Sequence, residues 1–406
     1  MPKSFVVKDP YVWLCCGFAA LGACLYGYEG VYFTGVSTLD VFVRDFGTRG
    51  DDGEFHISPQ NLAVMTSMIN VGELVGSLLA APLNDLFGRK GSLLTGSVAV
   101  VVGVVMQLST TSSRAIITAG RAVSGFGVGT FSVTSPLYMG NIEEDLEKES
   151  SSEIESAWIQ LITDPIERRK VIYSAGALIA QQINGIQWFY YFGTIFSKAI
   201  GLKDPFLMTL IVFIIQVFVV LAAVLLANKI PRRPLLLITT GIMTMSIFVV
   251  GCLGIPGGTP SETVGKVIIS FVIIEIVAFN FAWGPLGWTI ASEMAVGRNR
   301  NKIYAVAVAS FWVTVWATVF TLPYLYYSAN LGPKTGFVYT GLCFVTLSYV
   351  YFCVGEVTGR SIEEINGFFR DGIPARHWKK QPFAEAQRVH RVNLVEVQGH
   401  EKIANR

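Results

Sequence analysis

Long runs of apolar residues alternate with short polar connectors along most of this chain. A helix needs about 20 mostly apolar residues to cross a bilayer, because the hydrocarbon core offers no water to an irregular backbone. Roughly ten runs approach or exceed this length, at residues 11–39, 62–83, 91–108, 116–138, 171–200, 206–227, 235–254, 267–291, 303–327 and 337–354. The pattern therefore predicts an all-α membrane protein with about ten transmembrane helices.

The composition agrees with this class. Of the 406 residues, 52% are hydrophobic and only 15% are charged, against about 25% charged in an ordinary soluble domain. The formal net charge is only +2. These values exclude a soluble multidomain enzyme, a disordered chain and a nucleic-acid-binding protein that acts through a basic field.

Basic residues are concentrated in alternate connectors. By the positive-inside rule, such connectors face the cytosol. They contain Arg89 and Lys90, then Lys229, Arg232 and Arg233, then Arg298, Arg300 and Lys302. This arrangement predicts a multi-pass protein with both termini in the cytosol.

A polar, acidic segment at residues 139–170 interrupts the rhythm of the spans. We interpret it as a cytosolic linker with a short amphipathic helix near residues 154–162. It separates a partial N-terminal bundle of four spans, at 1–138, from a C-terminal bundle of six spans, at 171–358. The remaining polar residues, 359–406, are expected to form a partly disordered cytosolic tail.

The sequence contains none of the usual patterns of catalytic or metal-binding residues. The six cysteines lie in apolar runs without CxxC spacing, and none of the four histidines lies near a cysteine or in an HExxH motif. There is also no nucleotide-binding P-loop pattern. We therefore expect no metal, no cofactor and no enzymatic activity.

A short connector between two predicted spans contains Asp85, Gly88, Arg89 and Lys90. An acid at a helix end, a glycine for a tight turn and two cations form a charge network that can join neighbouring helix ends. The alternative is that these charges only fix the topology. A weaker copy of the pattern at residues 228–234 favours the first interpretation and suggests an internal repeat, which is common in transporters.

Arg121 lies inside a predicted span, within the glycine-rich stretch 120–129. Glycines let helices approach closely, whereas a guanidinium in a membrane needs a partner. Glu29 is the best candidate for that partner, with Glu73 and Glu275 as others. The alternative for each carboxyl group is a structural hydrogen bond to a neighbouring helix.

The run 171–200 contains an unusual density of amides. On a continuous helix, steps of three and four residues place Gln181, Asn184, Trp188 and Tyr191 on one face. Gln187 would flank this stripe, and Gln182 would point away from Asn184.

Uncharged hydrogen-bonding groups suit a neutral, hydroxyl-rich ligand. Trp283 and Trp288, on either side of Gly284-Pro285, add aromatic rings for the apolar face of such a ligand. The alternative is that the amides connect helices and the tryptophans lie at the membrane interface.

Taken together, these motifs resemble the sugar porter family of the major facilitator superfamily, especially its fungal monosaccharide transporters. The resemblance runs from Tyr26 to about Phe369. Its motifs are Tyr26-Gly27-Tyr28-Glu29, the loop 85–90, Gly120-Arg121, Pro136-Leu137-Tyr138, Gln181-Gln182, Tyr190-Tyr191, Arg232-Arg233-Pro234, Trp283-Gly284-Pro285, Trp288, the stretch 293–300 and the stretch 359–365.

The resemblance implies a central sugar site between two helical bundles that work by alternating access. It maps sugar ligands onto Gln181, Gln182, Gln187, Tyr191, Gln216, Trp288 and Trp312. It maps proton coupling onto Glu29 with Arg121. It maps a cytosolic gate onto Asp85, Arg89, Arg232, Arg233, Glu293, Arg300 and Glu356.

The sequence also departs from the family pattern. Glu29 stands where an aspartate is usual, and Phe311 and Val315 stand where polar residues are usual. After Tyr138 the chain passes directly into the acidic linker, whereas the family continues with its fifth and sixth helices. The chain thus resembles a porter that lacks two adjacent helices, one of which lines the cavity.

The resulting hypothesis is a monomeric, proton-coupled transporter of a small neutral sugar such as a hexose, embedded in the lipid bilayer of the plasma membrane. The alternatives are a passive sugar facilitator, a sugar sensor and an inactive truncated relative.

Overall fold

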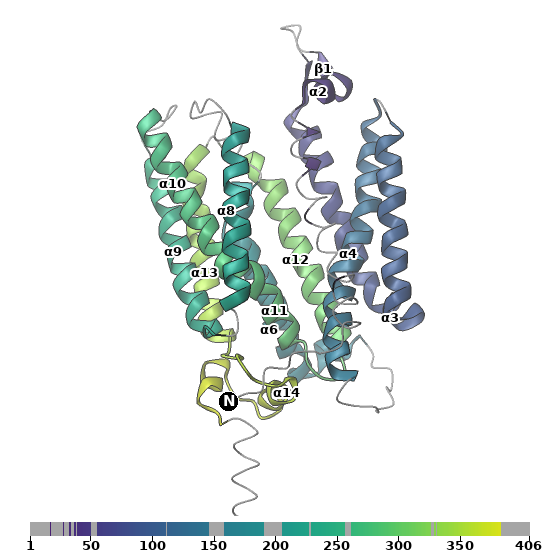
Figure 1. The fold of residues 1–406 in the computed structure, drawn as a ribbon, viewed down its shortest axis with the longest axis vertical. Helices are drawn as coiled ribbons and strands as arrows, with labels where there is room; N and C mark the ends of the chain where they lie inside the picture. The colour runs from purple at the N-terminus through teal and green to yellow at the C-terminus, as the bar shows by residue number, and fades with distance from the viewer. Residues whose placement is uncertain are drawn as a thin grey trace, which may run out of the picture.

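The computed structural model describes residues 32–33, 36–37, 39–49, 55–110, 112–145, 158–190, 205–226, 229–255, 261–325, 329 and 331–382, together with Gly17 and Gly27. This part of the chain is almost entirely helical. Its long helices run roughly side by side, with α3 and α4 on one side of α12 and with α8, α9, α10 and α13 on the other (Figure 1). The predicted class, an all-α membrane protein, is confirmed.

The N-terminal bundle is built around a helical hairpin. It comprises α2 (Asp40–Phe46), the two-residue antiparallel strands β1 (Thr48–Arg49) and β2 (Phe55–His56), α3 (Pro59–Leu108) and α4 (Arg114–Asp145). Gly88 has φ 66° and ψ 172°, which interrupts α3 and turns it back on itself. Glycine adopts positive φ without steric cost, so the tight turn predicted for this connector is confirmed.

Close backbone contact joins α3 to α4. A Cβ atom on Gly125 would lie 2.2 Å from the carbonyl oxygen of Ile69, and one on Gly129 would lie 2.1 Å from that of Glu73. No side chain fits at either position. In lipid, helices associate mainly through such van der Waals contact, because lipid tails are as apolar as the helix surface. The predicted role of the glycine-rich stretch 120–129 is thus confirmed.

The remaining elements form the C-terminal bundle and the segments directly before and after it. They are α5 (Gln160–Thr163), α6 (Pro165–Ile183), α8 (Pro205–Leu226), α9 (Arg232–Leu253), α10 (Glu262–Ala278), the π-helical stretch η1 (Phe279–Trp283), α11 (Gly284–Met294), α12 (Arg300–Pro323), η3 (Gly332–Lys334), α13 (Thr335–Cys353), α14 (Ile362–Arg370) and η4 (Ala375–Lys380). α12 packs against both α6 and α3, so it joins the two bundles.

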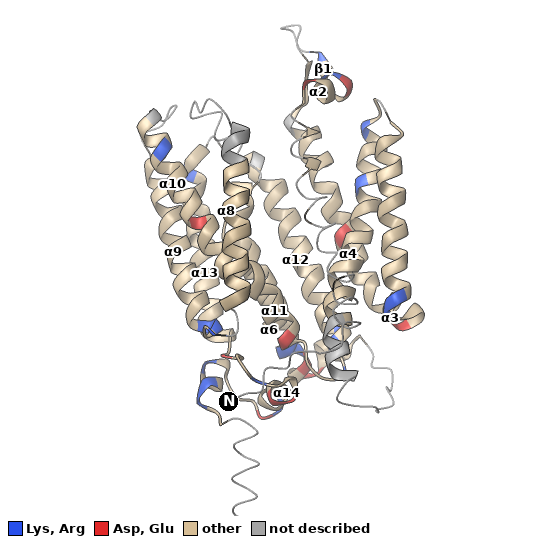
Figure 2. Ribbon diagram, in the orientation of Figure 1, with Lys and Arg blue, Asp and Glu red and all other residues tan. Residues whose placement is uncertain are grey.

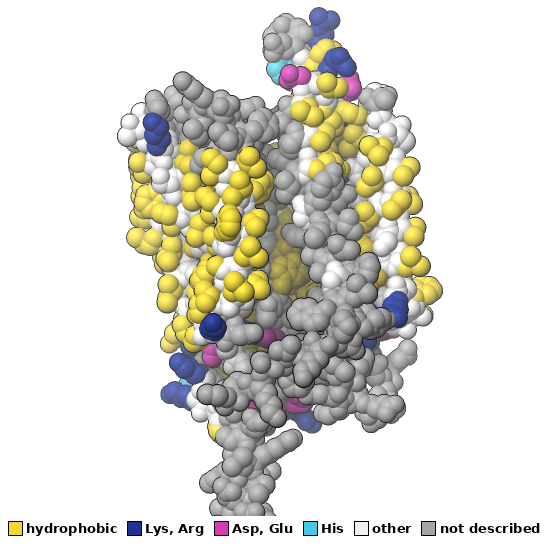
Figure 3. All heavy atoms as spheres, viewed as in Figure 1, with side chains coloured by type: hydrophobic (Ala, Val, Ile, Leu, Met, Phe, Trp, Pro, Cys, Tyr) yellow, Lys and Arg dark blue, Asp and Glu magenta, His cyan; other side chains and the backbone are white. Residues whose placement is uncertain are grey.

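Six helical segments of the described part are long and apolar enough to cross a membrane. They are Gln60–Leu108, Arg114–Tyr138, Arg232–Leu253, Thr263–Met294, Arg300–Leu322 and Gly332–Cys353, and the shorter Leu210–Leu226 is also apolar. The first of them contains two of the predicted runs, on either side of Gly88. Apolar side chains cover the visible sides of the helices, whereas charged residues lie mostly near their ends (Figures 2 and 3). The predicted run 11–39 lies almost wholly outside the described residues.

Several boundaries differ from the prediction. α4 continues to Asp145 and α6 begins at Pro165, so both ends of the predicted linker 139–170 are helical. Asp164 starts α6 because its side chain accepts a hydrogen bond from the N–H of Ile166 at 2.9 Å, as an N-cap does. Of the predicted amphipathic helix at 154–162, residues 154–157 lie outside the described part, and the helix α5 begins only at Gln160.

The tail was predicted to be partly disordered, and its residues 359–382 are ordered in the structure. Trp378 is fully buried and packs against Phe369 and Tyr173. Arg360 donates hydrogen bonds to the carbonyl oxygens of Trp378 and Gln381 at 2.9 and 2.5 Å. These contacts hold α14 and η4 against α6 and α13. Residues 383–406 lie outside the described part.

Gly129→Ala should strongly reduce the stability of the N-terminal bundle, because the added methyl group would collide with the α3 backbone. Overpacking of this kind typically costs about 1–3 kcal/mol. Thermal unfolding of the detergent-purified protein measures the effect. Gly241→Ala on α9 is the matched control, because an added Cβ meets nothing within 4 Å there. Equal melting temperatures for the two variants would contradict the packing argument.

Candidate functional site

The helix that contains the amides is broken in the middle of its predicted run. α6 ends at Ile183, and Gly185 has φ +93°. The side-chain oxygen of Asn184 accepts a hydrogen bond from the N–H of Ile186 at 3.2 Å, which satisfies a backbone donor that the broken helix leaves free. The prediction that Gln181, Asn184 and Trp188 share one face of a continuous helix is therefore wrong, because the periodicity does not continue across the break.

Gln181 fastens α6 to a second irregular segment. Its Nε2 donates hydrogen bonds to the backbone oxygens of Trp283 and Gly284 at 2.7 and 3.1 Å. These carbonyls lie where η1 passes into α11, and a π-helical turn of this kind frequently marks a functional site. The Gln181 side chain also lies against Gly287, where a Cβ would approach its Cδ to 2.8 Å. Its Oε1 is buried and has no hydrogen-bond partner among the described residues.

Other polar side chains brace the same irregular segment. Trp283 donates its indole N–H to Thr240 Oγ1 on α9 at 2.8 Å. Asn280 donates from Nδ2 to the hydroxyl of Tyr190 at 3.0 Å and to the carbonyl oxygen of Ile276 at 2.8 Å. The π-helical stretch is thus held by hydrogen bonds from two different sides.

Gln182 and Gln187 pair directly across the break. Nε2 of Gln187 donates to Oε1 of Gln182 at 2.6 Å, and both side chains are buried. Trp188, by contrast, is buried in the bundle, where it stacks between Phe189 and Tyr339. The structure therefore brings Gln182 together with Gln187, and it gives Trp188 a packing role.

An aromatic cluster connects the two bundles. Phe311 lies between Trp288 and Trp312, with ring centroids 4.8 and 4.7 Å away. The indole N–H of Trp312 donates to Ser132 Oγ on α4 at 3.4 Å. Trp288 follows directly after Gly287, the residue against which Gln181 packs. The predicted ligands Gln181, Trp288 and Trp312 therefore come from α6, α11 and α12, and Trp312 lies at the contact between the two bundles.

For two other predicted sugar ligands, the described part of the structure shows no hydrogen bond to the residues above. Gln216 lies on α8 and is partly exposed, and its Nε2 is buried without a hydrogen-bond partner in the described part. Tyr191 lies outside the described residues.

Arg121 is buried in the N-terminal bundle, with 1% of its surface exposed. Its guanidinium lies 4.0 Å from the centre of the Phe33 ring, and its Nη2 donates to the carbonyl oxygen of Thr66 at 3.4 Å. Its Nε and Nη1 have no hydrogen-bond partner among the residues that the structure describes. Glu29, the partner predicted for it, lies outside those residues.

Figure 2 also shows where the acidic residues lie. Most of those drawn in red are near the helix ends. By their exposed fractions, Glu73 on α3 and Glu275 on α10 are buried within the bundles. Glu275 has no exposed surface at all.

The predicted gate residues of the C-terminal bundle meet near α14. Arg232 forms an ion pair with Glu293. Glu356 accepts hydrogen bonds from the backbone N–H groups of Arg232 and Arg233, both at 3.2 Å, and from the hydroxyl of Thr358 at 2.5 Å. A carboxylate suits the free N–H groups at the start of α9, because a helix N-terminus carries partial positive charge. Asp85 and Arg89 flank the Gly88 turn in the other bundle, and Arg300 is the first residue of α12.

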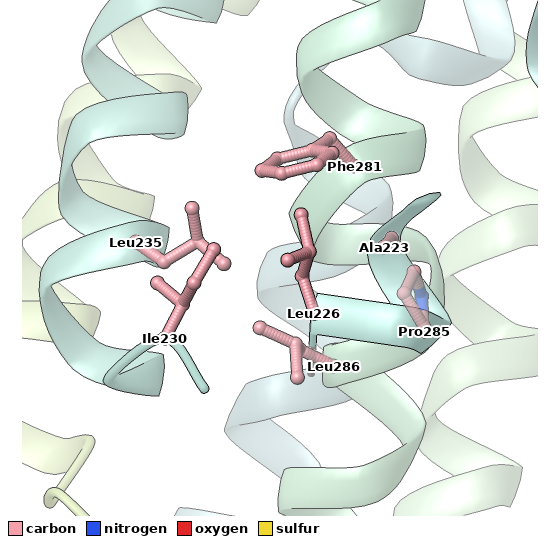
Figure 4. Close-up of a pocket in the computed structure, with 7 residues that line it drawn as sticks. All are labelled: Ala223, Leu226, Ile230, Leu235, Phe281, Pro285 and Leu286. Atoms are coloured by element: carbon pink, nitrogen blue, oxygen red, sulfur yellow. The ribbon is translucent and has the colours of Figure 1, made fainter. Parts of the chain in front are cut away.

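A separate pocket between α8, α9, η1 and α11 is lined only by apolar residues, which are Ala223, Leu226, Ile230, Leu235, Phe281, Pro285 and Leu286 (Figure 4). It offers no side-chain hydrogen-bonding group, so it does not suit a hydroxyl-rich ligand.

The sequence analysis assigned no role to four of these polar residues, Asn280, Tyr190, Thr240 and Ser132, although Tyr190 belongs to one of the family motifs. Asn280 could have been identified from the sequence, because it is an amide inside an apolar span, three residues before Trp283. The hydroxyl groups carry no comparable signal, because most threonines and serines of these helices bond only to their own backbone.

Comparison with solved structures first establishes the fold. The structure of the proton:xylose symporter XylE bound to 6-bromo-6-deoxy-D-glucose, a member of the major facilitator superfamily, matches with a TM-score of 0.67 and 18% identity, over 89% of this chain and 99% of that one. An inward-open structure of XylE from E. coli matches with a TM-score of 0.64 and 17% identity, over 88% of this chain and 100% of that one. The chain has the major facilitator superfamily fold.

Sequence comparison then gives the family. Residues 15–143 and 139–369 match the family described as "Sugar (and other) transporter", so the chain belongs to that family. The major facilitator-type transporter ecdD of Aspergillus rugulosus is 24% identical, over 92% of this chain and 91% of its own length. The low-affinity glucose transporter HXT4 of Saccharomyces cerevisiae is 23% identical, over 92% of this chain and 83% of its own length. Members of this family are transporters, so the expectation that the chain is not an enzyme is confirmed.

The relatives contain residues that this chain lacks. The alignments with ecdD and HXT4 extend over 496 and 481 positions, although the chain has 406 residues. The two matched parts of the family meet at residues 139–143. This is the place where the sequence suggested that two helices are missing.

Gln181→Glu should destabilise the C-terminal bundle, because it replaces an N–H donor by an oxygen that faces two backbone carbonyls. An unsatisfied buried group costs about 1–3 kcal/mol, which thermal unfolding in detergent would detect. Gln160→Glu is the control, because Gln160 already uses its oxygen to accept a hydrogen bond from Arg298. If both changes were tolerated equally, Gln181 would not hold α6 to η1.

Proposed function

We propose that this protein transports a small neutral monosaccharide, hexose-like in its hydroxyl pattern, by alternating access coupled to protons. The observation that supports this most is the convergence of Gln181, Trp288 and Trp312 from three helices in a member of a sugar transporter family. Amides and indoles bind hydroxyl groups and apolar sugar faces without a charge in the bilayer.

In this proposal, the sugar lies near mid-membrane between the bundles. Gln182, Gln187, Tyr191 and Gln216 would complete its ligands. Because Gln181 Oε1 and Gln216 Nε2 have no partner among the described residues, each has hydrogen-bonding capacity left for a ligand.

Arg121 is the residue on which the proposed coupling depends. Two of its guanidinium nitrogens have no hydrogen-bond partner among the described residues, and an unpaired charge at this depth is costly. A carboxylate at Glu29 would pair with it, and protonation of Glu29 would release it. The bundles could then rock about the contact between α3 and α12.

The contacts of Arg232, Glu293 and Glu356 support a gate at the α14 end of the C-terminal bundle, and Asp85, Arg89, Arg233 and Arg300 are its other proposed members. We assign this end and both termini to the cytosol, on the positive-inside pattern. We further propose that the protein works as a monomer in the plasma membrane.

Uptake of labelled hexose in transporter-null cells tests the proposal. Uptake should be faster at an external pH of about 5.5 than at about 7.5, because protons drive it, and a protonophore should abolish accumulation. Glu29→Gln should remove the pH dependence, whereas Glu363→Gln on the exposed face of α14 should not change it. If the rate of uptake changed with neither pH, protonophore nor Glu29→Gln, proton coupling would be contradicted and the protein would be a passive facilitator.

The residues that relatives have and this chain lacks favour a second candidate, a sugar sensor or inactive relative. A purified protein that binds hexose but gives no uptake after reconstitution would identify a sensor. Failure to recover folded protein from the membrane would indicate an inactive form.

A further inference from the structure

Glu275 on α10 is an acid in an unusual place. None of its surface is exposed, and neither of its carboxyl oxygens has a hydrogen-bond partner among the described residues. An ionised carboxylate without a partner is penalised by several kcal/mol in such surroundings. A protonated carboxyl group carries no charge and avoids most of this cost. The environment seen here therefore fits the neutral form.

No described cation compensates for a charge on Glu275. Among the residues that the structure describes, the titratable groups that interact electrostatically with Glu275 are the hydroxyl of Tyr190, beyond the break in α6, and the thiol of Cys343 on α13. Thr244 on α9 lies beside the same thiol and is neutral, as is Asn280 in η1. On α10 itself the basic residue is Lys266, which is exposed. A structural ion pair with a described residue, the ordinary explanation for a buried acid, is thus not present.

The surroundings of Glu275 contain a further unused polar group. The thiol of Cys343 donates to the carbonyl oxygen of Asn184 at 3.5 Å. Asn184 is fully buried, and its Nδ2 has no hydrogen-bond partner among the described residues. A buried polar group without a partner is costly, so Glu275 and Asn184 Nδ2 together mark a polar place inside the C-terminal bundle.

Glu275 is also connected to the proposed sugar site through the backbone. Its carbonyl oxygen accepts the N–H of Phe279, the first residue of η1. The next turn contains Asn280, which binds Tyr190, and then Trp283, whose carbonyl oxygen binds Gln181. A charge that forms at Glu275 would attract N–H and O–H donors. The Asn280 amide, which now donates to the Tyr190 hydroxyl and to the carbonyl oxygen of Ile276, is one such donor, and the O–H of Tyr190 is another.

We propose that Glu275 is a proton-binding site of the C-terminal bundle, distinct from Glu29 and Arg121 in the other bundle. Its carboxyl group is protonated in the conformation described here. In another state of the transport cycle, water reaches Glu275 and takes up its proton. The resulting carboxylate disturbs the Tyr190–Asn280 contact, and sugar binding weakens as a consequence. The effect on sugar rests on the proposed function, whereas the protonation of Glu275 does not.

Infrared difference spectroscopy of the reconstituted protein tests the protonation directly. The C=O stretch of a protonated carboxyl group should be present at acidic pH and disappear at alkaline pH. The comparison is made in the Glu29→Gln background, because Glu29 is proposed to bind a proton as well. There, Glu275→Gln should remove this signal, and Glu363→Gln, which changes an exposed acid on α14, should leave it. Glu275→Asp retains the acid and should give a displaced signal, so the assignment does not depend on one variant. A wild-type spectrum without such a signal, or with one that never titrates, overturns the proposal.

Hexose binding, followed by tryptophan fluorescence, tests the consequence for the sugar. Wild-type affinity should fall about tenfold when Glu275 ionises, equivalent to about 1.4 kcal/mol. When both proteins also have Glu29→Gln, which removes the other proposed proton-binding acid, affinity in Glu275→Gln should remain within about twofold over the same pH range, a change of less than about 0.5 kcal/mol. An equal fall in both proteins overturns the link to sugar. If the wild type binds no hexose at any pH, the proposed function fails, and the infrared signal still decides whether Glu275 binds a proton.

Discussion

A bilayer offers no hydrogen bonds, and this constraint explains most of the structure. Every backbone N–H and C=O group within the hydrocarbon must find a partner in the protein. The long helices meet this requirement by themselves. Where the helices break, at Asn184–Gly185 and at η1, the partners come from side chains, among them Asn184 Oδ1 and Gln181 Nε2.

The same constraint gives the amides two roles. Gln181 uses its N–H₂ group to hold the α11 backbone, and its oxygen has no hydrogen-bond partner among the described residues. An amide suits this position because it has both a donor and an acceptor and carries no charge. The helix break and the proposed ligand site therefore occur together for one physical reason, since irregular backbone in a membrane protein is tolerated where polar side chains already gather.

Helices pack against one another through different residues in the two bundles. Glycines bring α3 and α4 into backbone contact, with Gly125 and Gly129 each facing a carbonyl oxygen. The C-terminal bundle instead has large aromatic residues in its interior, including Trp188, Trp283 and Phe311, whose rings or indole N–H groups contact neighbouring helices. α12 contacts both bundles, and Trp312 on it reaches Ser132 on α4. Relative motion of the bundles must rearrange this contact.

The sequence by itself determined the class, most of the membrane helices, the Gly88 turn and the family, because apolar length, glycine and charge act locally along the chain. It also identified Gln181, Trp288 and Arg121 as unusual for a membrane helix. Only the tertiary structure decided that Gln182 pairs with Gln187, that Trp188 packs internally, that Asn280 meets Tyr190, and that residues 359–382 fold against the bundle. Those outcomes depend on which distant helix lies against each side chain. A break such as the one at Gly185 changes the direction of the side chains that follow it, and the periodicity of a continuous helix does not reveal this change.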